Sequence, residues 1–309
     1  MTSTARYLGI EIGGTKLPIV VGDASAQILE RHRYHVDRGR GGEGIREQIQ
    51  AALAELVPAH HPAAIGVGFG GPVDWRTGQI CCSHQIEGWS DFPLGDWLRA
   101  LARLPVAVDN DANTATLGEA TLGAGVGLNP VFYVTLGSGV GGGLVVDGRI
   151  YHGAKPGEAE IGHVRLDRQG TFVESRCSGW AVDRRIRELR NRNPESPLAR
   201  LTAGTHGGEA RFLVQALQQG DPTARGLLGE VAEDLAFGLS QVAHLFHPEV
   251  IVLGGGLSLV GEPLRVAVAE ALPAFVMDAF KPGPQVRLAA LGEDAVPTGA
   301  LLLARQAVP

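Results

Sequence analysis

Apolar runs and glycine turns alternate near the start of the chain. Residues 7–12 and 17–21 are mostly apolar and predict two buried strands joined by a tight turn at Gly13 and Gly14. A further turn at Gly22-Asp23 leads into a third predicted strand. The pattern therefore predicts three consecutive strands in which the chain returns on itself at glycine turns.

The same order of strands and turns occurs again in the second half of the chain. Residues 131–136 and 141–146 are apolar runs separated by Gly137-Ser138-Gly139, and Asp147-Gly148 gives a hairpin signal after them. Two copies of one pattern predict a duplicated α/β domain, because each copy can build one nucleotide-facing half of a cleft. The repeat is therefore interpreted as two domains and not as a solenoid.

The remaining stretches carry helical and strand patterns. Apolar spacing predicts helices at 44–57, 93–104, 221–246 and 295–308. Apolar runs predict strands at 64–73, 106–113 and 249–258. The strand from residue 106 runs directly into polar residues, which are typical of a cleft when they lie at the carboxyl end of a strand. Prolines and glycines in 190–209 predict a mobile surface segment.

Length and composition limit the class of protein. With 309 residues the chain is long for one hydrophobic core, so two domains flanking a cleft are expected. A hydrophobic fraction of 44% and a net charge of −6 are typical of a soluble globular protein and give no basis for a nucleic-acid partner. No apolar run approaches the roughly 18 residues of a membrane span, and the first residues lack a long apolar stretch with a cleavage site, so we expect neither a membrane span nor a signal peptide.

The three cysteines give no sign of a disulfide framework. Cys81 and Cys82 are adjacent and Cys177 is alone, so their spacing matches neither paired disulfides nor a metal motif such as C-x-x-C. A reducing, cytoplasmic location is expected from this usage.

The first glycine turn is a candidate phosphate site. Its backbone N–H groups and the Thr15 hydroxyl can approach phosphate oxygens, and Lys16 can add positive charge. An ordinary glycine hairpin is an equal alternative for Gly13 and Gly14 taken alone. The turn is not a P-loop, because the G-x-x-x-x-G-K-[ST] spacing and the following helix are missing.

The second glycine turn has the same chemistry. Ser138 supplies a hydroxyl between Gly137 and Gly139, as Thr15 does in the first turn, so two such turns can hold one triphosphate. A strand follows these glycines instead of a helix, which disfavours dinucleotide binding. The triple glycine at 254–256 follows another apolar run and can let adenine or ribose lie against the backbone, although this signal is weak alone.

Residues 109–113, with the sequence DNDAN, place two carboxylates and two amides at a strand end. Such groups can hold sugar hydroxyls, and one carboxylate can remove a proton during phosphoryl transfer. The alternative is a capped helix start, because Asp and Asn are also preferred N-cap residues. One residue can cap while its neighbour faces a substrate, and the sequence leaves open which residue does which.

A second polar group lies further along the chain. Glu160 and His163 are three residues apart and Glu174 follows, a set of side chains suited to a polyol. A satisfied or metal-binding histidine is the alternative for His163, and the metal alternative is weak because only Cys177 is nearby.

Taken in order, these segments resemble the ROK family of bacterial sugar kinases over essentially the whole chain. The family's D-x-G-G-T motif corresponds to residues 11–15, its G-T-G-x-G-x-G motif to 137–143, and its N-D-A-N segment to 110–113. The resemblance implies a duplicated actin-like (ribonuclease H-like) ATPase fold. It also implies that Asp111 is the general base and that ATP with Mg²⁺ is the phosphate donor.

The resemblance also implies a set of sugar ligands. The family's G-E-I-G-H motif corresponds to residues 159–163, so Glu160 and His163 are expected to bind sugar hydroxyls. The other expected substrate-binding residues are Gly71, Gln85, Asn110, Asp111 and Glu174. The expected nucleotide-binding residues are Glu11, Gly13, Gly14, Thr15, Lys16, Gly137, Ser138, Gly139, Gly254, Gly255 and Gly256.

Three positions depart from the family's pattern. Glu11 replaces the usual Asp, which lengthens the reach toward Mg²⁺, and Gln85 replaces a sugar-binding Asn. The family's cysteine-rich zinc loop is absent, with Phe172 in the place of its last Cys and Glu174 on its sugar-binding Glu. We therefore expect no structural zinc, and we expect apolar packing around Phe172 and Trp180 to replace it.

The resemblance implies ATP-dependent phosphorylation of a hexose, with glucose and its 6-hydroxyl favoured. Fructose, mannose or an N-acetylhexosamine as acceptor, and polyphosphate as donor, are open alternatives. A ROK-type repressor is disfavoured, because the first strand begins near residue 7 and leaves no room for a helix-turn-helix. A silent sugar sensor is also possible, although intact Asn110 and Asp111 argue against it.

The expected domains are a smaller one of 1–109 plus 296–309 and a larger one of 110–295. If the tail helix returns to the first domain, hinges are expected near 105–110 and 294–297, where closure would exclude water. The resemblance further implies a cytoplasmic homodimer without membrane or nucleic-acid partners.

Overall fold

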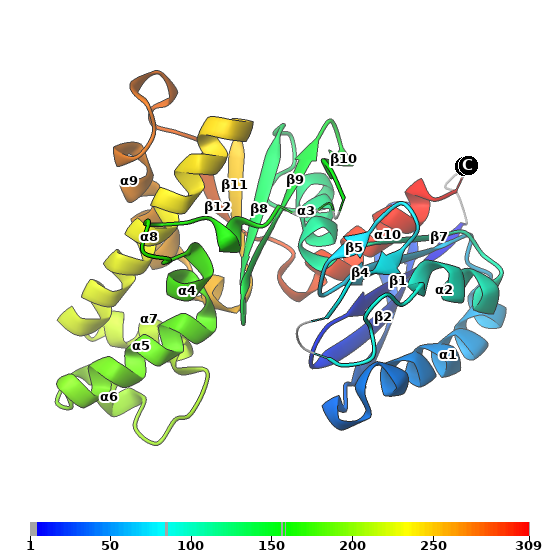
Figure 1. Ribbon diagram of the computed structural model, residues 1–309, viewed down its shortest axis with the longest axis horizontal. Coiled ribbons are helices and arrows are strands. Elements are labelled where there is room, and N and C mark those ends of the chain that lie inside the picture. Colours follow the sequence, from blue (N-terminus) through cyan, green and yellow to red (C-terminus); the bar gives the residue numbers. More distant parts are fainter. Residues whose placement is uncertain (1–4, 84–85, 156, 158, 309) are drawn as a thin grey trace. The chain divides into compact units, whose positions relative to one another are not determined.

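The computed structural model describes residues 5–83, 86–155, 157 and 159–308 (Figure 1). Contacts along the chain divide it into two compact units. Unit 1 consists of Met1–Val126, Gly143–Ala159 and Glu293–Pro309, and unit 2 of Gly127–Gly142 and Glu160–Gly292.

The first sheet is the framework of unit 1. Its strand order is β3-β2-β1-β4-β7, antiparallel from β1 to β3 and parallel from β1 to β7. The strands are β1 (Arg6–Ile12), β2 (Lys16–Asp23), β3 (Ile28–His35), β4 (Ile65–Phe69) and β7 (Val106–Asn110), with a small hairpin of β5 (Val73–Asp74) and β6 (Gln79–Ile80). The apolar runs near the start of the chain thus form the antiparallel edge of this sheet.

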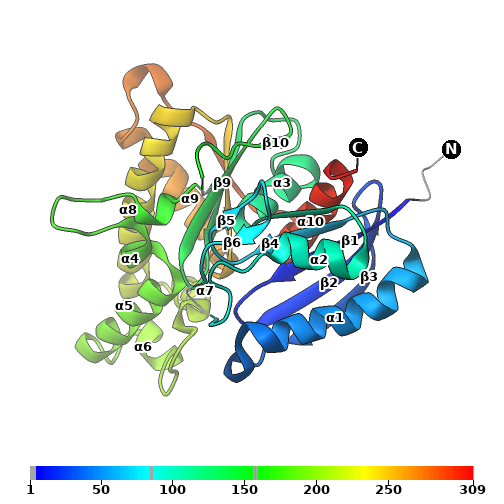
Figure 2. The ribbon, with the colours of Figure 1, turned by 45° about the vertical axis from the view of Figure 1, so that its right-hand side comes forward.

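Helices cover both faces of the first sheet. Figures 1 and 2 show α1 (Gly41–His60) and α2 (Leu94–Ala102) along one face and α10 (Ala295–Gln306) on the other. Alternate residues of β1 serve the two faces, because successive side chains of a strand point to opposite sides. Leu8 belongs to the core that includes residues of α1 and α2, and Tyr7 to the core that includes residues of α10.

The tail helix α10 belongs to unit 1. It packs so closely on the sheet that a Cβ at Gly66 would lie 1.8 Å from the Ala300 carbonyl oxygen. A side chain at Gly299 would meet the Thr114 carbonyl oxygen of α3 (Asp111–Leu122) at the same distance. Because α3 packs on α10 in this way, unit 1 extends beyond the predicted boundary at residue 109 and also takes in 143–159.

The second sheet repeats the order of the first. Its order is β10-β9-β8-β11-β12, with β11 parallel to both β8 and β12. The strands are β8 (Val131–Leu136), β9 (Val140–Val146), β10 (Arg149–Ile150), β11 (Val250–Gly254) and β12 (Gln285–Leu288). The glycine turn between β8 and β9 therefore corresponds to the one between β1 and β2, as the repeated sequence pattern predicts.

Helices make up most of the rest of unit 2. They are α4 (Val173–Cys177), α5 (Gly179–Arg192), α6 (Pro197–Leu201), α7 (Leu213–Gln218), α8 (Pro222–Phe246) and α9 (Glu262–Ala271). Its short 3-10 helices are η2 (Ile161–His163), η3 (Glu209–Phe212), η4 (Gly256–Val260), η5 (Leu272–Ala274) and η6 (Asp278–Phe280). Unit 1 contains η1 (Arg38–Arg40), and η7 (Gly292–Asp294) spans the boundary between the units. Within the described part of the chain, no helix is long and apolar enough to cross a membrane.

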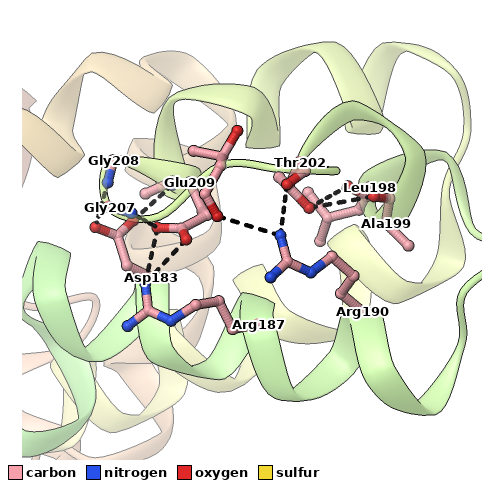
Figure 3. A network of polar contacts seen from close by, with 11 residues as sticks. Asp183, Arg187, Arg190, Leu198, Ala199, Thr202, Gly207, Gly208 and Glu209 are labelled. Atoms are coloured by element: carbon pink, nitrogen blue, oxygen red, sulfur yellow. Dashed lines mark hydrogen bonds and ion pairs between the residues drawn. The ribbon is translucent and has the colours of Figure 1, made fainter.

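The stretch 190–209, predicted to be a mobile surface segment, combines exposed positions with polar contacts to buried residues (Figure 3). Glu209 is fully buried, and both of its carboxylate oxygens accept bonds of 2.9 Å from Arg187 Nη1. Arg190 Nη1 donates to the Thr202 carbonyl at 2.5 Å. The prolines and glycines therefore mark turns between short helices, and the Arg and Glu side chains that fix those turns lie apart in sequence.

Candidate functional site

The polar segment after β7 begins helix α3. Asn110 is the N-cap, and its Oδ1 accepts hydrogen bonds from the backbone N–H groups of Ala112 at 2.8 Å and Asn113 at 3.2 Å. Its Nδ2 donates to the Gly71 carbonyl at 3.2 Å. The structure thus answers the question left by the sequence, because Asn110 caps the helix and Asp111 is its first residue.

The two carboxylates of Glu11 and Asp111 lie near each other in unit 1. Burial and the negative charge of Asp111 raise the pKa of Glu11 to about 7, against the weaker opposite effect of Lys16. Mg²⁺ prefers oxygen ligands, and the carboxylate oxygens of these two neighbouring acids are ligands of that kind. A divalent cation there would favour the charged form of both groups, so these residues are compatible with the expected metal.

The first glycine turn presents its hydroxyl to solvent. Thr15 and Lys16 are both exposed, and the turn is closed by a 3.3 Å bond from the Gly13 N–H to the Lys16 carbonyl. The Arg38 side chain holds the Gly14 carbonyl at 2.9 Å. The Lys16 ammonium forms an ion pair with Glu293 at 2.7 Å, so in this structure its charge is directed to that acid.

The second glycine turn is tied to two elements of unit 2. Gly179, at the start of α5, donates its N–H to the Gly137 carbonyl at 2.7 Å. Glu174 Oε2 accepts from the Val140 N–H at 2.9 Å, and a Cβ at Gly139 would lie 2.5 Å from that oxygen. Only glycine at 139 lets the carboxylate lie here, and Ser138 remains exposed between the two glycines.

The triple glycine has a mainly structural basis. A Cβ at Gly254 would lie 2.0 Å from the Tyr133 hydroxyl, and one at Gly255 would lie 2.6 Å from the Leu136 backbone nitrogen. Gly255 also has φ +79°, where glycine is favoured. Gly256 has no atom within 4 Å of such a Cβ, so this residue alone of the three borders open space in the described structure.

Glu160 is the N-cap of η2 and His163 is its last residue, and both are exposed. The His163 Nδ1 and a Glu160 carboxylate oxygen are 3.7 Å apart, and the side chains are 71% and 53% exposed. Phe172 stacks against the His163 ring, with a centroid distance of 5.8 Å. Part of the expected aromatic support of His163 is therefore present.

Trp180 does not supply the rest of that support. It is 61% exposed, which corrects the expectation that it packs with Phe172. Instead it lines a pocket of about 450 Å³ in unit 2, together with Asp183, Arg184, Arg187, His206 and Gly207. Sequence reasoning missed this pocket, although the position of Trp180 directly after Ser178-Gly179 was a signal.

The floor of this pocket is electrically balanced. Both oxygens of Asp183 accept backbone N–H groups, from Gly208 at 2.8 Å and from Ala210 at 2.7 Å, and Arg187 pairs with Glu209 (Figure 3). The indole of Trp180 therefore lies beside satisfied polar groups, an arrangement suited to a flat, uncharged ring.

Cys177 and Gln85 are the last residues that the sequence analysis singled out. Burial raises the pKa of the Cys177 thiol to about 12, which keeps it protonated, and its Sγ lies 3.7 Å from the Val231 carbonyl oxygen. Among the described residues, no group of three or more His, Cys, Asp or Glu is arranged to hold a metal ion. Gln85 lies outside the described residues.

The fold and its two glycine turns define a class of protein. Two sheets of the same order, each with a glycine turn between its first two strands, are the arrangement of the actin-like α/β ATPases, and the predicted fold class is confirmed. The model of the ROK family matches residues 7–307. The chain belongs to the ROK family, as the sequence motifs predict.

Relatives and solved structures support the same assignment. The glucokinase of Halalkalibacterium halodurans is 34% identical over 97% of this chain and 95% of its own length. The glucokinase of Streptomyces coelicolor is 33% identical over 98% of both chains. The crystal structure of a ROK family glucokinase from Streptomyces griseus, in complex with glucose and AMPPNP, has a TM-score of 0.83 and 33% identity and covers 98% of this chain and 100% of its own.

Proposed function

We propose that this protein transfers the γ-phosphate of ATP to the 6-hydroxyl of glucose. The observation that carries the proposal is the position of Asp111 as the first residue of α3, directly after a cap formed by Asn110. The similarity to glucokinases over nearly the whole chain supports glucose as acceptor, and the AMPPNP complex of the Streptomyces griseus enzyme supports ATP as donor.

In this proposal Asp111 takes the proton from the sugar hydroxyl. The hydroxyl oxygen then forms a bond to the γ-phosphorus as the bond to the β,γ-bridging oxygen breaks, and ADP leaves. Glu11 and the phosphate oxygens would hold Mg²⁺, which neutralises phosphate charge when bound. The Thr15 and Ser138 hydroxyls and the N–H groups of Gly14 and Gly139 are proposed to hold the phosphates. The Gly13 and Gly137 N–H groups already donate within their own turns, to the carbonyls of Lys16 and Gly139.

Glu160, His163 and Glu174 are proposed to bind sugar hydroxyls. The same role is proposed for Gly71, Gln85 and Asn110. The exposed carboxylate of Glu160 and ring of His163 have hydrogen-bonding capacity for a polyol. For Glu174 the sugar role is proposed for the oxygen that is not engaged by Val140. Asn110 contributes less than expected, because its Oδ1 already accepts two backbone N–H groups.

The nucleoside of ATP is proposed to bind in the pocket beside Trp180. Gly179 bonds to the second phosphate turn, so its neighbour Trp180 lies one residue from a group that holds phosphate. An exposed indole beside Arg184 and His206 offers one flat apolar face and polar edges, which fits a purine. Gly256 would supply further open backbone, and η4 packs near η3 on the same side of unit 2.

Polyphosphate as donor is a second candidate with an observation in its favour. A pocket of about 410 Å³ beside Thr15 is lined by Lys16, Arg31 and Arg33, which could extend the phosphate site. The three cations already pair with acids, Lys16 and Arg33 with Glu293 and Arg31 with Asp294. Because these pairs would have to break, ATP remains the first choice.

A substrate panel tests the proposal. Glucose, fructose, mannose and N-acetylhexosamines are each offered with ATP or polyphosphate, and consumption of the donor is measured. We expect glucose with ATP to give the highest kcat/KM. A donor that is consumed only with another sugar would change the acceptor, and no consumption with any pair would leave a sugar-binding sensor as the function.

Three further properties are proposed. The absence of structural zinc rests on the missing cysteine loop, and elemental analysis that found one zinc per chain would contradict it. A homodimer is proposed from the family, and light scattering in solution tests it. A cytoplasmic location is proposed from the cysteine usage and the family, and cell fractionation tests it.

A further inference from the structure

A buried polar cluster surrounds the proposed catalytic segment, residues 109–113, in unit 1. Asp109, the residue before the Asn110 cap, is 3% exposed and ends in a carboxylate with three hydrogen-bonding partners. Its Oδ1 accepts from the Asn110 N–H at 2.8 Å and from Asn113 Nδ2 at 3.0 Å, and its Oδ2 lies 2.5 Å from His152 Nε2. Trp75 stacks on the His152 ring with a centroid distance of 4.1 Å. We call Trp75, Asp109, Asn113 and His152 the His152 cluster.

The cluster fastens one loop to the catalytic segment. The described residues of this loop, which follows β10, are 151–155, 157 and 159, and residue 159 precedes the proposed sugar ligand Glu160. His152 attaches the loop to Asp109, and the Gly157 carbonyl accepts from Asn113 Nδ2 at 2.8 Å. Lys155 forms an ion pair with Asp74, next to Trp75.

The two titratable side chains of the cluster are largely occupied by partners within the protein. Asp109 is buried and its oxygens are engaged by Asn110, Asn113 and His152. The His152 side chain is 15% exposed and lies between Trp75 and Asp109. Their effect on chemistry must therefore act through the residues that they hold.

Asp109 and Asn113 bracket the proposed base. Asp109 is two residues before Asp111 and Asn113 two residues after it, and a single hydrogen bond of 3.0 Å joins them across it. His152 is a third partner that binds the same carboxylate from a different part of the chain. Removing it would leave a buried carboxylate with one donor fewer, and such a group tends to shift toward water or a new donor.

We propose that His152 is a positioning residue for phosphoryl transfer. Through its contact with Asp109, His152 fixes the orientation of Asp111. Through the described residues of its loop, His152 also links Asp111 to the segment that leads into Glu160. The inference rests on the proposed function, in which Asp111 is the base. Small displacements of a catalytic group can reduce rate by up to about a hundredfold, so the effect should appear in kcat.

Three variants of the His152 cluster separate its components. His152→Phe keeps a ring for Trp75 and removes the donor to Asp109, and we expect kcat for glucose to fall about 20-fold with the ATP KM unchanged within about twofold. His152→Gln retains an N–H donor, and we expect kcat to return to within about threefold of wild type. Trp75→Leu keeps the donor but removes the stack, and we expect a fall of about threefold to fivefold.

A matched control has the same chemistry far from the catalytic segment. His32 Nε2 lies 2.6 Å from a carboxylate oxygen of Glu30 on β3, also in unit 1. We expect His32→Phe to keep wild-type kcat and KM values. If His32→Phe lowered kcat as much as His152→Phe, the effect would come from general loss of a His–carboxylate pair and the inference would be overturned.

Hydrogen exchange supplies a readout that does not need activity. We expect the backbone amides of residues 106–113 to exchange about tenfold faster in His152→Phe than in wild type and His152→Gln, because their carboxylate partner is less constrained. A wild-type kcat in His152→Phe, no rescue by His152→Gln, or unchanged exchange in that segment would each overturn the inference. If the wild-type protein phosphorylated no sugar, the proposed function would fail, and the exchange data would still decide whether His152 holds the segment.

Discussion

The catalytic segment and the sugar motif of this protein are held in very different ways. Asp109, Asn110 and Asn113 are nearly fully buried, and their polar atoms are bonded to one another and to the start of α3. The side chains of Glu160 and His163 are more than half exposed and lie 3.7 Å apart. The proposed base is thus flanked by buried, hydrogen-bonded side chains, whereas the proposed sugar ligands are exposed to solvent.

This difference teaches which kinetic constant each region should control. A group that is prepositioned for proton transfer contributes mainly to kcat, since its interaction with substrate is made in the transition state. Ligands that order only when the sugar arrives contribute to ground-state binding and hence to KM. Variants in the two regions should therefore separate kcat effects from KM effects.

The largest expected effect is that of Asp111→Asn. The amide keeps hydrogen bonds but cannot accept the proton, so we expect kcat to fall by about a thousandfold or more while glucose affinity stays within about tenfold. Steady-state kinetics and calorimetry with glucose measure the two quantities. Asn113→Ala is no suitable control, because it removes a partner of Asp109, whereas His61→Gln on the surface of unit 1 is. Turnover near the wild-type rate in Asp111→Asn would show that the base lies elsewhere.

The opposite pattern is expected for Glu174→Gln. The amide oxygen can still accept the Val140 N–H, but one carboxylate oxygen becomes an NH₂ donor, so a sugar hydroxyl loses its acceptor. We expect the glucose KM to rise about tenfold, with kcat reduced less than threefold and the ATP KM nearly unchanged. If the ATP KM rose instead, the role of Glu174 would be to hold the second phosphate turn, and the proposed sugar contact would be wrong.

A smaller effect is expected for Trp180→Ala. Loss of the stacking surface should raise the ATP KM about fivefold and leave the glucose KM unchanged. Trp180→Phe keeps an aromatic face and should restore most of the affinity. Binding of AMP, which has a base but no γ-phosphate, should weaken by a similar factor in Trp180→Ala when measured by calorimetry. Equal AMP binding in wild type and Trp180→Ala would place the nucleoside outside this pocket.

The sequence predicts the framework of these regions better than their details. The strand predicted at 131–136 has the same bounds as β8, because an apolar run between turn signals determines a buried strand locally. The choice between Asn110 and Asp111 as the cap depends on backbone angles at one residue, and DNDAN offers four side chains that could cap. The contact between His152 and Asp109 joins residues 43 apart, and no local pattern encodes it.

Trp180 is a residue whose surroundings the sequence analysis predicted wrongly. Large aromatic side chains are usually buried, which favoured a packing role beside Phe172, but a tryptophan that begins a helix can face either side of it. Helix α5 buries Ala181, Val182 and Ile186, and this periodicity leaves Trp180 on the exposed side. The burial pattern of the helix was therefore a better guide than the residue type.

The last prediction concerns stability instead of kinetics, and it tests how Glu11 makes the free energy of unfolding depend on pH. Its pKa is raised from 4.5 to about 7 in the folded protein, by burial first and by Asp111 second. Between these values the folded state binds more protons than the unfolded state, so the free energy of unfolding should fall as pH rises from about 5 to 8 in metal-free protein. Glu11→Gln removes this titration, and we expect it to flatten the decline by on the order of 2 kcal/mol. Glu55→Gln, an exposed change in α1, is the control and should leave the slope unchanged.

Mg²⁺ with nucleotide would compete with the proton for Glu11, so adding both should stabilise wild type more at pH 8 than at pH 6. Denaturant unfolding in EDTA at several pH values measures the slopes. Parallel slopes for wild type and Glu11→Gln would mean that Glu11 titrates in its ordinary range. Burial and the neighbouring Asp111 would then not raise its pKa.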